Sequence, residues 1–534
     1  MIFPRSSGIL MHLTSLPGTP GIGTLGNCAY AFVDWLASAH QSLWQMLPIG
    51  PTGYGDSPYA SFSTYAGNPL LIDLDMLAEK GWMEKASAVP PGYITSAGQV
   101  NYGSVVWWKL PVLKAAAVYF LKDADTASLD MYKIFANDNA SWLNHFASFM
   151  TIKEYYDAEA QKTQTNGIWY AFWPKALRSC SSSAVAEWDA CHQQEIACIK
   201  VIQFFFYFQW TALKSYAGTK GISLIGDIPI FVAQDSADVW SNQNLFQLDT
   251  DGVPKSVAGV PPDYFSATGQ LWGNPLYDWD AMKKTGYAWW VERIRHMLTL
   301  VDYVRIDHFR GFEAYWAVPF GEKTAVNGRW LPGPGKALFE AVKEGTRSEL
   351  PVIAEDLGLI TKKVQELRDS CGFPGMKVLQ FAFSTQEAAE NGMINAFLPH
   401  MYIPDCVVYT GTHDNETLQG WLEHASPAQV MLIASYLYAA PVTEMEIHEL
   451  VQSYKLCRKL VTAALASTAR FAVVPMQDIC ALGDDARMNT PATTGANWAW
   501  RADCKCFTKE SAQSLAYISD LYGRNIKTKR QGEI

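Results

Sequence analysis

Tyr303-Val-Arg-Ile-Asp-His-Phe-Arg-Gly-Phe312 places two charges at the end of a short apolar run, Leu300–Ile306. Side chains alternate between the two faces of a strand, so Arg305 and Asp307 share one face. The arginine favours the ionised form of the neighbouring carboxylate. Burying a charged group costs free energy, so a charge at the end of a buried strand favours a functional role for that residue. The stretch therefore predicts a buried strand that presents a carboxylate at its carboxyl end.

Seven further apolar segments also end in polar or Gly/Pro-rich loops. In chain order the eight predicted strands are Gly8–Leu13, Ser42–Pro48, Ile222–Val232, Leu300–Ile306, Leu350–Glu355, Met376–Phe383, Cys406–Thr410 and Arg470–Gln477. Helical patterns separate most of them, at 30–39, 285–300, 334–346, 361–370, 426–438 and 445–466. Eight buried strands alternating with helices predict an α/β fold, a (β/α)8 TIM barrel with helical and loop insertions.

The insertions define the predicted domain organisation. The gap between the second and third strands is too long for one loop, and residues 79–200 show mostly helical patterns. We therefore expect a helical insertion at 79–200 and a catalytic barrel formed by 1–78 and 201–534. The segment 253–277 holds four prolines and three glycines and predicts a loop that folds over the site as a lid.

Composition excludes several classes of protein. The chain has 534 residues, 49% of them hydrophobic and 18% charged, as in an ordered globular protein. Its net charge of -10 argues against a nucleic-acid or acidic-polymer partner. The sequence shows no uninterrupted apolar run of about 18 residues, so we expect no membrane segment.

The ten cysteines include no Cys-x-x-Cys pair, and Cys504-Lys-Cys506 has poor zinc spacing. We therefore predict no metal site and no cofactor. Scattered cysteines without a signal peptide indicate reduced thiols and a cytoplasmic protein, with a plastid location open for a processed chain. No prediction of oligomeric state follows.

Three carboxylates fall at the ends of the fourth, fifth and seventh strands: Asp307, Glu355 and Asp414. The strand ends of a barrel converge on one mouth. Two carboxylates close together fit retaining glycosyl transfer, in which one attacks the anomeric carbon and the other protonates the leaving oxygen. Arg305 suits Asp307 to attack, whereas Glu355, after three apolar residues, suits an acid with a raised pKa. A barrel ion pair or helix cap would explain any one of them, but three at corresponding strand ends favour an active site.

Two nearby residues are assigned no chemistry. Strand alternation sends His308 away from the mouth. Asp478, at the end of the eighth strand, is predicted to have a structural hydrogen-bonding role.

The motifs resemble those of the 4-α-glucanotransferases, also called amylomaltases or disproportionating enzymes, glycoside hydrolase family 77 of the α-amylase clan. The main blocks are Val304–Phe312, Ala354–Gly358 and Gly411–Glu416. The likeness covers essentially the whole chain and extends to Gly8–Pro17, Gly55-Asp-Ser-Pro-Tyr59, Gly226–Ile230, Pro261–Ser266, Gly269–Pro275 and Arg487-Met-Asn489.

This resemblance implies a role for each matching residue. Asp307 is expected to be the nucleophile, Glu355 the general acid/base and Asp414 the stabiliser of the transition state. Residues expected to contact the glucan are Tyr59, Ser57, Asp263, Trp272, Arg305, Phe381, His413 and Asn489, with Asn497 as the alternative to Asn489. Ala60 stands where many relatives carry a polar residue.

The leading hypothesis is a transferase that moves a segment of an α-1,4-glucan to the 4-hydroxyl of an acceptor glucan or glucose. It would proceed by double displacement through a covalent glycosyl-aspartate. The alternatives are an α-glucan hydrolase of the same clan and a non-enzymatic glucan-binding protein. Transfer requires that water be excluded, which a lid carrying Trp272 would provide.

Overall fold

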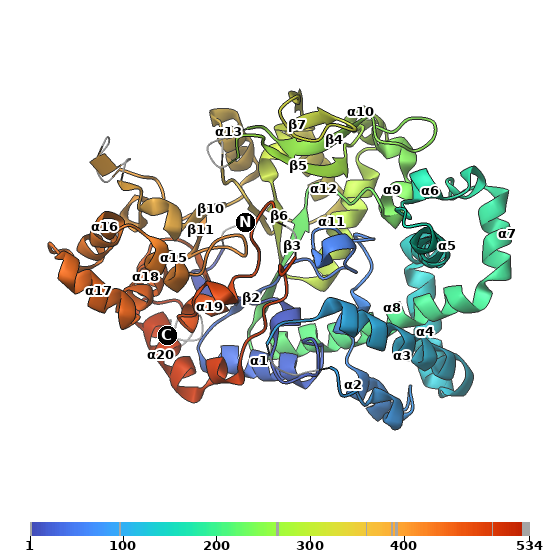
Figure 1. Ribbon diagram of the computed structural model, residues 1–534, viewed down its shortest axis with the longest axis horizontal. Coiled ribbons are helices and arrows are strands. Elements are labelled where there is room, and N and C mark those ends of the chain that lie inside the picture. The colour runs from blue at the N-terminus through green and yellow to red at the C-terminus, as the bar shows by residue number, and fades with distance from the viewer. Residues whose placement is uncertain are drawn as a thin grey trace.

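Eight short parallel strands form the central sheet of the computed structural model, in the order β10-β11-β12-β1-β2-β3-β6-β9 (Figure 1). The backbone N–H of Ala354 in β9 donates to Pro374 O beside β10 at 3.0 Å, so the edges meet and the sheet is nearly closed. The strands are β1 Ser6–Leu10, β2 Leu43–Gln45, β3 Ser223–Pro229, β6 Tyr303–Asp307, β9 Val352–Ala354, β10 Gly375–Val378, β11 Cys406–Tyr409 and β12 Phe471–Pro475.

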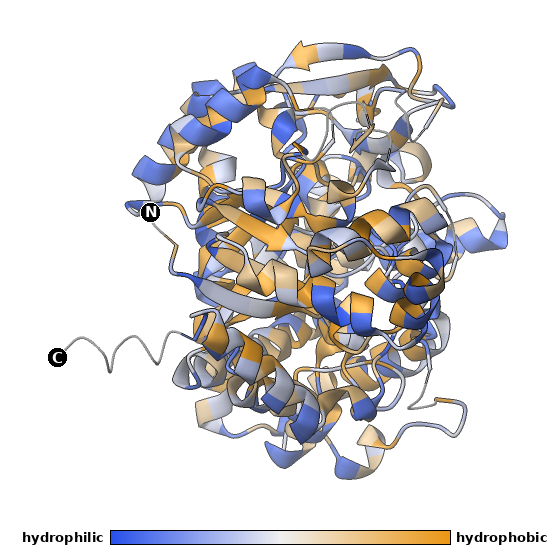
Figure 2. Cartoon of the chain, turned by 90° about the vertical axis from the view of Figure 1, so that its left-hand side faces the viewer, coloured by the Kyte–Doolittle hydropathy of each residue, from blue (hydrophilic) through white to orange (hydrophobic). Residues whose placement is uncertain are grey.

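The predicted α/β barrel is confirmed, since each of these strands overlaps one of the eight predicted segments. The structure describes residues 3–94, 98–262, 266–358, 360–385, 388–389, 394–493 and 495–525. The strands β1, β2, β9, β11 and β12 are buried along their whole length, because side chains fill the barrel and helices cover it. Figure 2 shows hydrophobic residues gathered on the central strands.

Helices connect the strands and cover the barrel. Their bounds are α1 Asn27–Ser38, α2 Leu74–Glu79, α3 Tyr102–Asp123, α4 Thr126–Asp138, α5 Ala140–Lys162, α6 Trp169–Phe172, α7 Ser183–Cys191, α8 Gln193–Thr219, α9 Ala237–Ser241, α10 Trp279–Lys284, α11 Ala288–Leu300, α12 Lys336–Thr346, α13 Lys362–Cys371, α15 Leu418–His424, α16 Pro427–Tyr438, α17 Glu444–Gln452, α18 Lys455–Ala466, α19 Met476–Ile479 and α20 Lys509–Leu521.

One predicted helix is wrong in its continuity. The sequence predicts a single helix over 445–466, but the structure has α17 and α18 there. Tyr454 separates them with a left-handed backbone, at φ +58°. A residue with a left-handed backbone cannot continue a right-handed helix, so the chain changes direction between α17 and α18.

The helices α3 to α7 lie between β2 and β3 in sequence and gather on one side of the barrel, at the right in Figure 1. The predicted boundary of the insertion, at residue 200, falls inside α8, which packs against both α3 and the barrel strand β3. A buried ion pair also ties this layer to the barrel, since Lys153 Nζ lies 2.5 Å from Asp235 Oδ2. The division of the chain into two domains stays a prediction.

The segment 253–277 is not the irregular loop that its prolines and glycines predict. It contains the strands β4 (Ser256–Val260) and β5 (Gln270–Pro275), which join β7 (Ala314–Pro319) and β8 (Arg329–Pro332) in an antiparallel sheet of order β5-β4-β7-β8. A Cβ at Gly259 would lie 2.5 Å from Gln270 O, so this glycine serves close strand packing. The small sheet lies above the barrel in Figure 1, and its role as a lid stays a prediction.

Two helices, α3 and α8, are long and apolar enough to cross a membrane by length and composition alone. In α8, 61% of the most apolar window is buried inside the protein, and in α3 33% is. Buried Lys109 of α3 donates to Leu70 O at 2.7 Å. Packing against the barrel accounts for the apolar composition of α8.

Candidate active site

Arg305 lies between two carboxylates at the carboxyl end of β6. Its Nη2 is 2.8 Å from Asp307 Oδ1, and its Nη1 donates to both oxygens of Asp227 at 2.8 and 2.7 Å. The side chain of Asp307 is 33% exposed, whereas those of Arg305 and Asp227 are buried. Buried Asp227 therefore holds the guanidinium in place, and Nη2 of the guanidinium contacts Asp307, the more exposed of its two carboxylate partners.

Sequence reasoning did not single out Asp227, although its motif was noted. The register of β3 against β6 places it directly beside Arg305. Its Oδ2 also accepts a hydrogen bond from the Tyr59 hydroxyl at 2.8 Å. The sequence feature that could have identified Asp227 is an aspartate inside an apolar strand, because a buried charge requires a partner.

We expect Asp227→Asn to lower kcat roughly 100-fold, because Arg305 and Tyr59 lose the carboxylate that positions them and small displacements at a reacting centre cost rates of this size. KM should change less than kcat. Steady-state kinetics with maltotriose measure both constants, with circular dichroism as the check on folding. A variant with unchanged kcat would remove Asp227 from any positioning role.

Glu355 follows β9, and the backbone fixes its side chain. Its Oε2 accepts from His308 N at 2.7 Å and its Oε1 from Leu357 N at 2.9 Å. Burial and the negative charge of Asp307 raise the pKa of the Glu355 carboxyl to about 8, against the opposing effect of Arg305. The group is therefore protonated at neutral pH and suited to act as an acid.

His308 does not point away from the mouth, as strand alternation predicts. It has a left-handed backbone, at φ +53°, and the strand ends at Asp307. With this backbone conformation, the backbone N–H of His308 donates to Glu355. The His308 ring lies 4.7 Å from the ring of Trp272, edge to face. Burial lowers the pKa of His308 to about 4, so the ring is neutral at neutral pH.

Asp414 lies on the loop after β11 and is held by a second loop. Asn489 Nδ2 donates to Asp414 Oδ1 at 2.7 Å, and Arg487 Nη2 donates to Asp414 O at 2.7 Å. His413 Nε2 is 3.4 Å from Asp414 Oδ1. The ring of His413 stacks on that of Tyr59, with centroids 5.1 Å apart. Asp414 is thus linked through His413 to Tyr59, and the Tyr59 hydroxyl donates a hydrogen bond to Asp227.

A cavity of about 540 Å³ opens over these groups. Of the predicted site residues, those that line it are Ser57, Tyr59, Trp272, Asp307, His413, Asp414 and Asn489. Arg305 and Glu355 do not line it, and they contact residues that do. Trp498, which sequence reasoning missed, also lines the cavity and packs its ring 5.8 Å from those of Tyr59 and His413.

The remaining predictions have different outcomes. Phe381 is 38% exposed, packs edge-to-face against Phe397 and does not line the cavity. Asp263 lies outside the described residues. Asn497 accepts from Thr490 N at 3.0 Å within its own loop, so Asn489 is the amide that reaches the carboxylate cluster.

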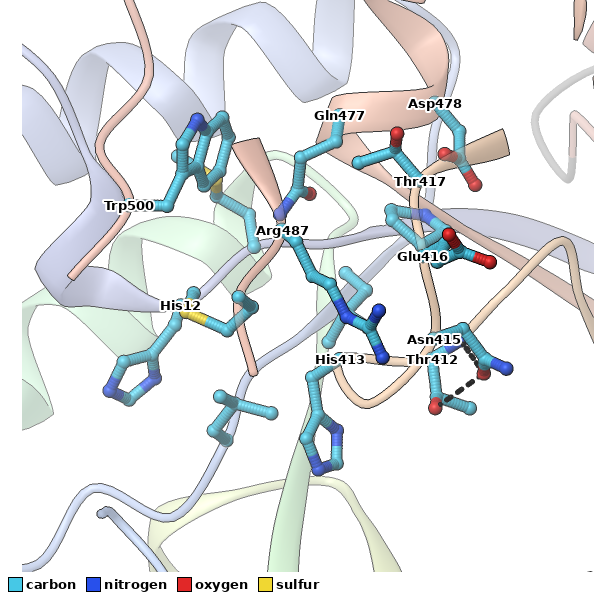
Figure 3. A pocket seen from close by; sticks show the side chains of 15 residues that line it. His12, Thr412, His413, Asn415, Glu416, Thr417, Gln477, Asp478, Arg487 and Trp500 are labelled. Atoms are coloured by element: carbon cyan, nitrogen blue, oxygen red, sulfur yellow. Dashed lines mark hydrogen bonds between the residues drawn. The ribbon is translucent and has the colours of Figure 1, made fainter. Parts of the chain in front are cut away.

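Figure 3 shows a smaller cavity, which the loop after β11 also lines. His12, His413 and Arg487 line it, and the side chain of Asn415 accepts from Thr412 N and Oγ1, both at 2.9 Å. These bonds keep the loop in one conformation. Asp478 lies nearby and accepts from Thr410 Oγ1 at 2.5 Å and Leu418 N at 2.8 Å, the structural role predicted for it.

One group within the described ranges brings together side chains that could hold a metal: Glu416, His424 and Asp484, whose ligand atoms lie within 4.8 Å of one another. The sequence predicts no metal site, because no cluster of His, Asp and Glu in it has the spacing of a metal motif. His424 is exposed, and its hydrogen bond to Glu416 raises its pKa. An ordinary surface ion pair accounts for this group, and we assign it no metal.

The comparisons with known proteins agree with the resemblance seen in the motifs. The sequence profile of the 4-α-glucanotransferase family matches residues 11–506. A 4-α-glucanotransferase of Thermus thermophilus is 46% identical over 503 residues, which cover 94% of this chain and 95% of the relative. A chloroplastic/amyloplastic 4-α-glucanotransferase of Solanum tuberosum is 42% identical over 529 residues, covering 97% of this chain and 86% of the relative.

Among solved structures, the amylomaltase of Streptococcus agalactiae in complex with acarbose has a TM-score of 0.89 with this chain at 38% identity. The match covers 97% of this chain and 99% of the amylomaltase. The chain therefore belongs to the 4-α-glucanotransferase family, glycoside hydrolase family 77.

Proposed function

We propose that this enzyme transfers a segment of an α-1,4-glucan to the 4-hydroxyl of an acceptor glucan or of glucose, through a covalent glycosyl intermediate on Asp307. One observation carries the mechanism. Burial and the nearby charge of Asp307 raise the pKa of the Glu355 carboxyl to about 8, whereas Asp307 itself is partly exposed and paired with Arg305. One group is thus suited to attack and the other to donate a proton.

In the first step, Asp307 attacks the anomeric carbon and the glycosidic bond breaks. Glu355 gives its proton to the departing oxygen, so the leaving chain departs with a free 4-hydroxyl. Positive charge develops on the sugar in the transition state, and the carboxylate of Asp414 stabilises it.

In the second step, an acceptor 4-hydroxyl attacks the same carbon and the bond to Asp307 breaks. Esterification removes the negative charge of Asp307, and this charge is one of the causes that raise the pKa of Glu355. The pKa of Glu355 therefore falls in the intermediate, and the carboxylate becomes the base that takes the acceptor's proton. Two inversions give net retention.

The expected products distinguish transfer from hydrolysis. Incubation with maltotriose should yield glucose and longer oligomers while total reducing ends stay constant, because each bond broken is replaced by another. Chromatography with a reducing-end assay measures both quantities. A steady rise in reducing ends would identify an α-glucan hydrolase, and no change in the maltotriose would leave a non-enzymatic glucan-binding protein.

Activity should fall as the pH rises through about 8, because Glu355 must be protonated for the first step and its pKa lies there. A profile of kcat/KM against pH for maltotriose tests this limb, since kcat/KM reports the ionisation of the free enzyme. A rate that stays constant through that pH would show that Glu355 is not the acid.

A further inference from the structure

A second cavity, of about 530 Å³, lies between the helical layer and the barrel, apart from the active-site cavity. It is lined by the junction of α4 and α5, by α9 and the turn that follows it, and by α11, elements that are labelled in Figure 1. We call it the α5–α11 groove.

Two aromatic rings form one wall of the α5–α11 groove. Tyr65 and Trp142 lie almost parallel, at 14° with centroids 6.1 Å apart, and both are partly exposed. The ring of His296 packs edge-on against each of them. Trp142 Nε1 donates to Asn139 Oδ1 at 2.9 Å, which holds the indole in place. Rigid, partly exposed rings of this kind bind the apolar faces of sugars.

The rest of the lining offers mainly hydrogen-bonding groups, and its acidic residues outnumber its basic ones, which disfavours an anion. Neutral polar side chains that line it are Asn139, Ser141, Ser241, Asn242, Asn244, Thr285 and Thr299. The charged groups are largely engaged: Glu292 pairs with Arg295, and Asp238 accepts two hydrogen bonds from Thr64. Asp138 adds one exposed carboxylate. This chemistry suits a neutral, polyhydroxylated ligand better than an ion.

The groove and the active site share two segments of chain. Ser57, Tyr59 and Phe62 line the active-site cavity, and Tyr65 on the same loop lines the groove. The segment after β3 likewise gives Asp235 to the active site and Asp238 to the groove. The two cavities are thus lined by neighbouring residues of the same two segments, so we expect one long glucan to reach both.

We propose that the α5–α11 groove is a second glucan-binding site, which holds a segment of α-1,4-glucan outside the active site. The inference rests on the proposed function, because the ligand it names is that enzyme's substrate. A glucan held there stays near the active site between transfers, so long chains gain affinity and maltotriose does not.

Trp142→Ala should lower the affinity for amylose roughly tenfold, as the loss of one aromatic platform gives, and should leave kcat/KM for maltotriose within about twofold. Retardation in native gels containing amylose measures the affinity. Because Trp142 also packs inside the protein, exposed Asn244→Ala is the second variant. Exposed Asn137→Ala, outside the groove, is the matched control and should show no change.

Hydrogen exchange locates the site directly. Maltoheptaose should protect 139–145 and 237–245 in the unmodified protein, and this protection should be lost in Trp142→Ala and retained in Asn137→Ala. Protection confined to active-site segments, or equal retardation of all variants, would overturn the second site while maltotriose turnover stays intact. Loss of maltotriose turnover in the unmodified protein would instead contradict the proposed function.

Discussion

Asp307→Ala is expected to lower the rate of glucan transfer by about 10⁴- to 10⁶-fold, the range seen when the nucleophile of a covalent mechanism is removed. Glu355 cannot take over as the nucleophile, because it is protonated and held by two backbone N–H groups. Initial rates of glucose release from maltotriose measure the loss.

Folding should survive this substitution. Arg305 keeps both hydrogen bonds to Asp227 when Asp307 is removed, so no buried charge is left without a partner. A thermal melt tests this, and Asp75→Ala, an exposed aspartate on α2, is the matched control. Transfer activity within a few-fold of the unmodified protein would show that Asp307 is not the nucleophile.

The barrel could be predicted because its signal is local. Each strand is a short apolar run that ends in polar residues. A few consecutive residues therefore predict both that the strand is buried and where its carboxyl end lies. The prediction of Asp307, Glu355 and Asp414 rests on the same signal. Asp307 ends β6, Glu355 directly follows β9, and Asp414 lies on the loop after β11.

The partners of these carboxylates could not be predicted in the same way. Asp227 acts through Arg305 and Tyr59, which are brought to it by strand register and by a loop more than a hundred residues away in the chain. His308 was misplaced because its direction depends on a left-handed backbone that period-two alternation does not anticipate. The α5–α11 groove exists only between layers that pack together in the folded protein.

Glu355→Gln is expected to lower kcat on maltotriose by about 10²- to 10⁴-fold, the contribution of a positioned general acid. The amide cannot donate a proton to the glycosidic oxygen, and its NH₂ group cannot accept the backbone hydrogen bond that the oxygen it replaces accepts. Steady-state kinetics measure the loss, and a melting curve shows whether the altered bonding also affects stability.

A donor with a good leaving group separates the two steps of this variant. With α-maltosyl fluoride, fluoride departs without protonation, so Asp307 can still attack in Glu355→Gln. The second step stays slow, because no base takes the acceptor's proton. The intermediate should therefore accumulate, and mass spectrometry should find one maltosyl group on a peptide that contains Asp307. If the group were absent, the covalent mechanism would be wrong, and if it were found on another residue, Asp307 would not be the nucleophile. The control variant is Glu154→Gln, at an exposed position on α5. It should accumulate no intermediate under the same treatment, because Glu355 is intact in it and completes the second step.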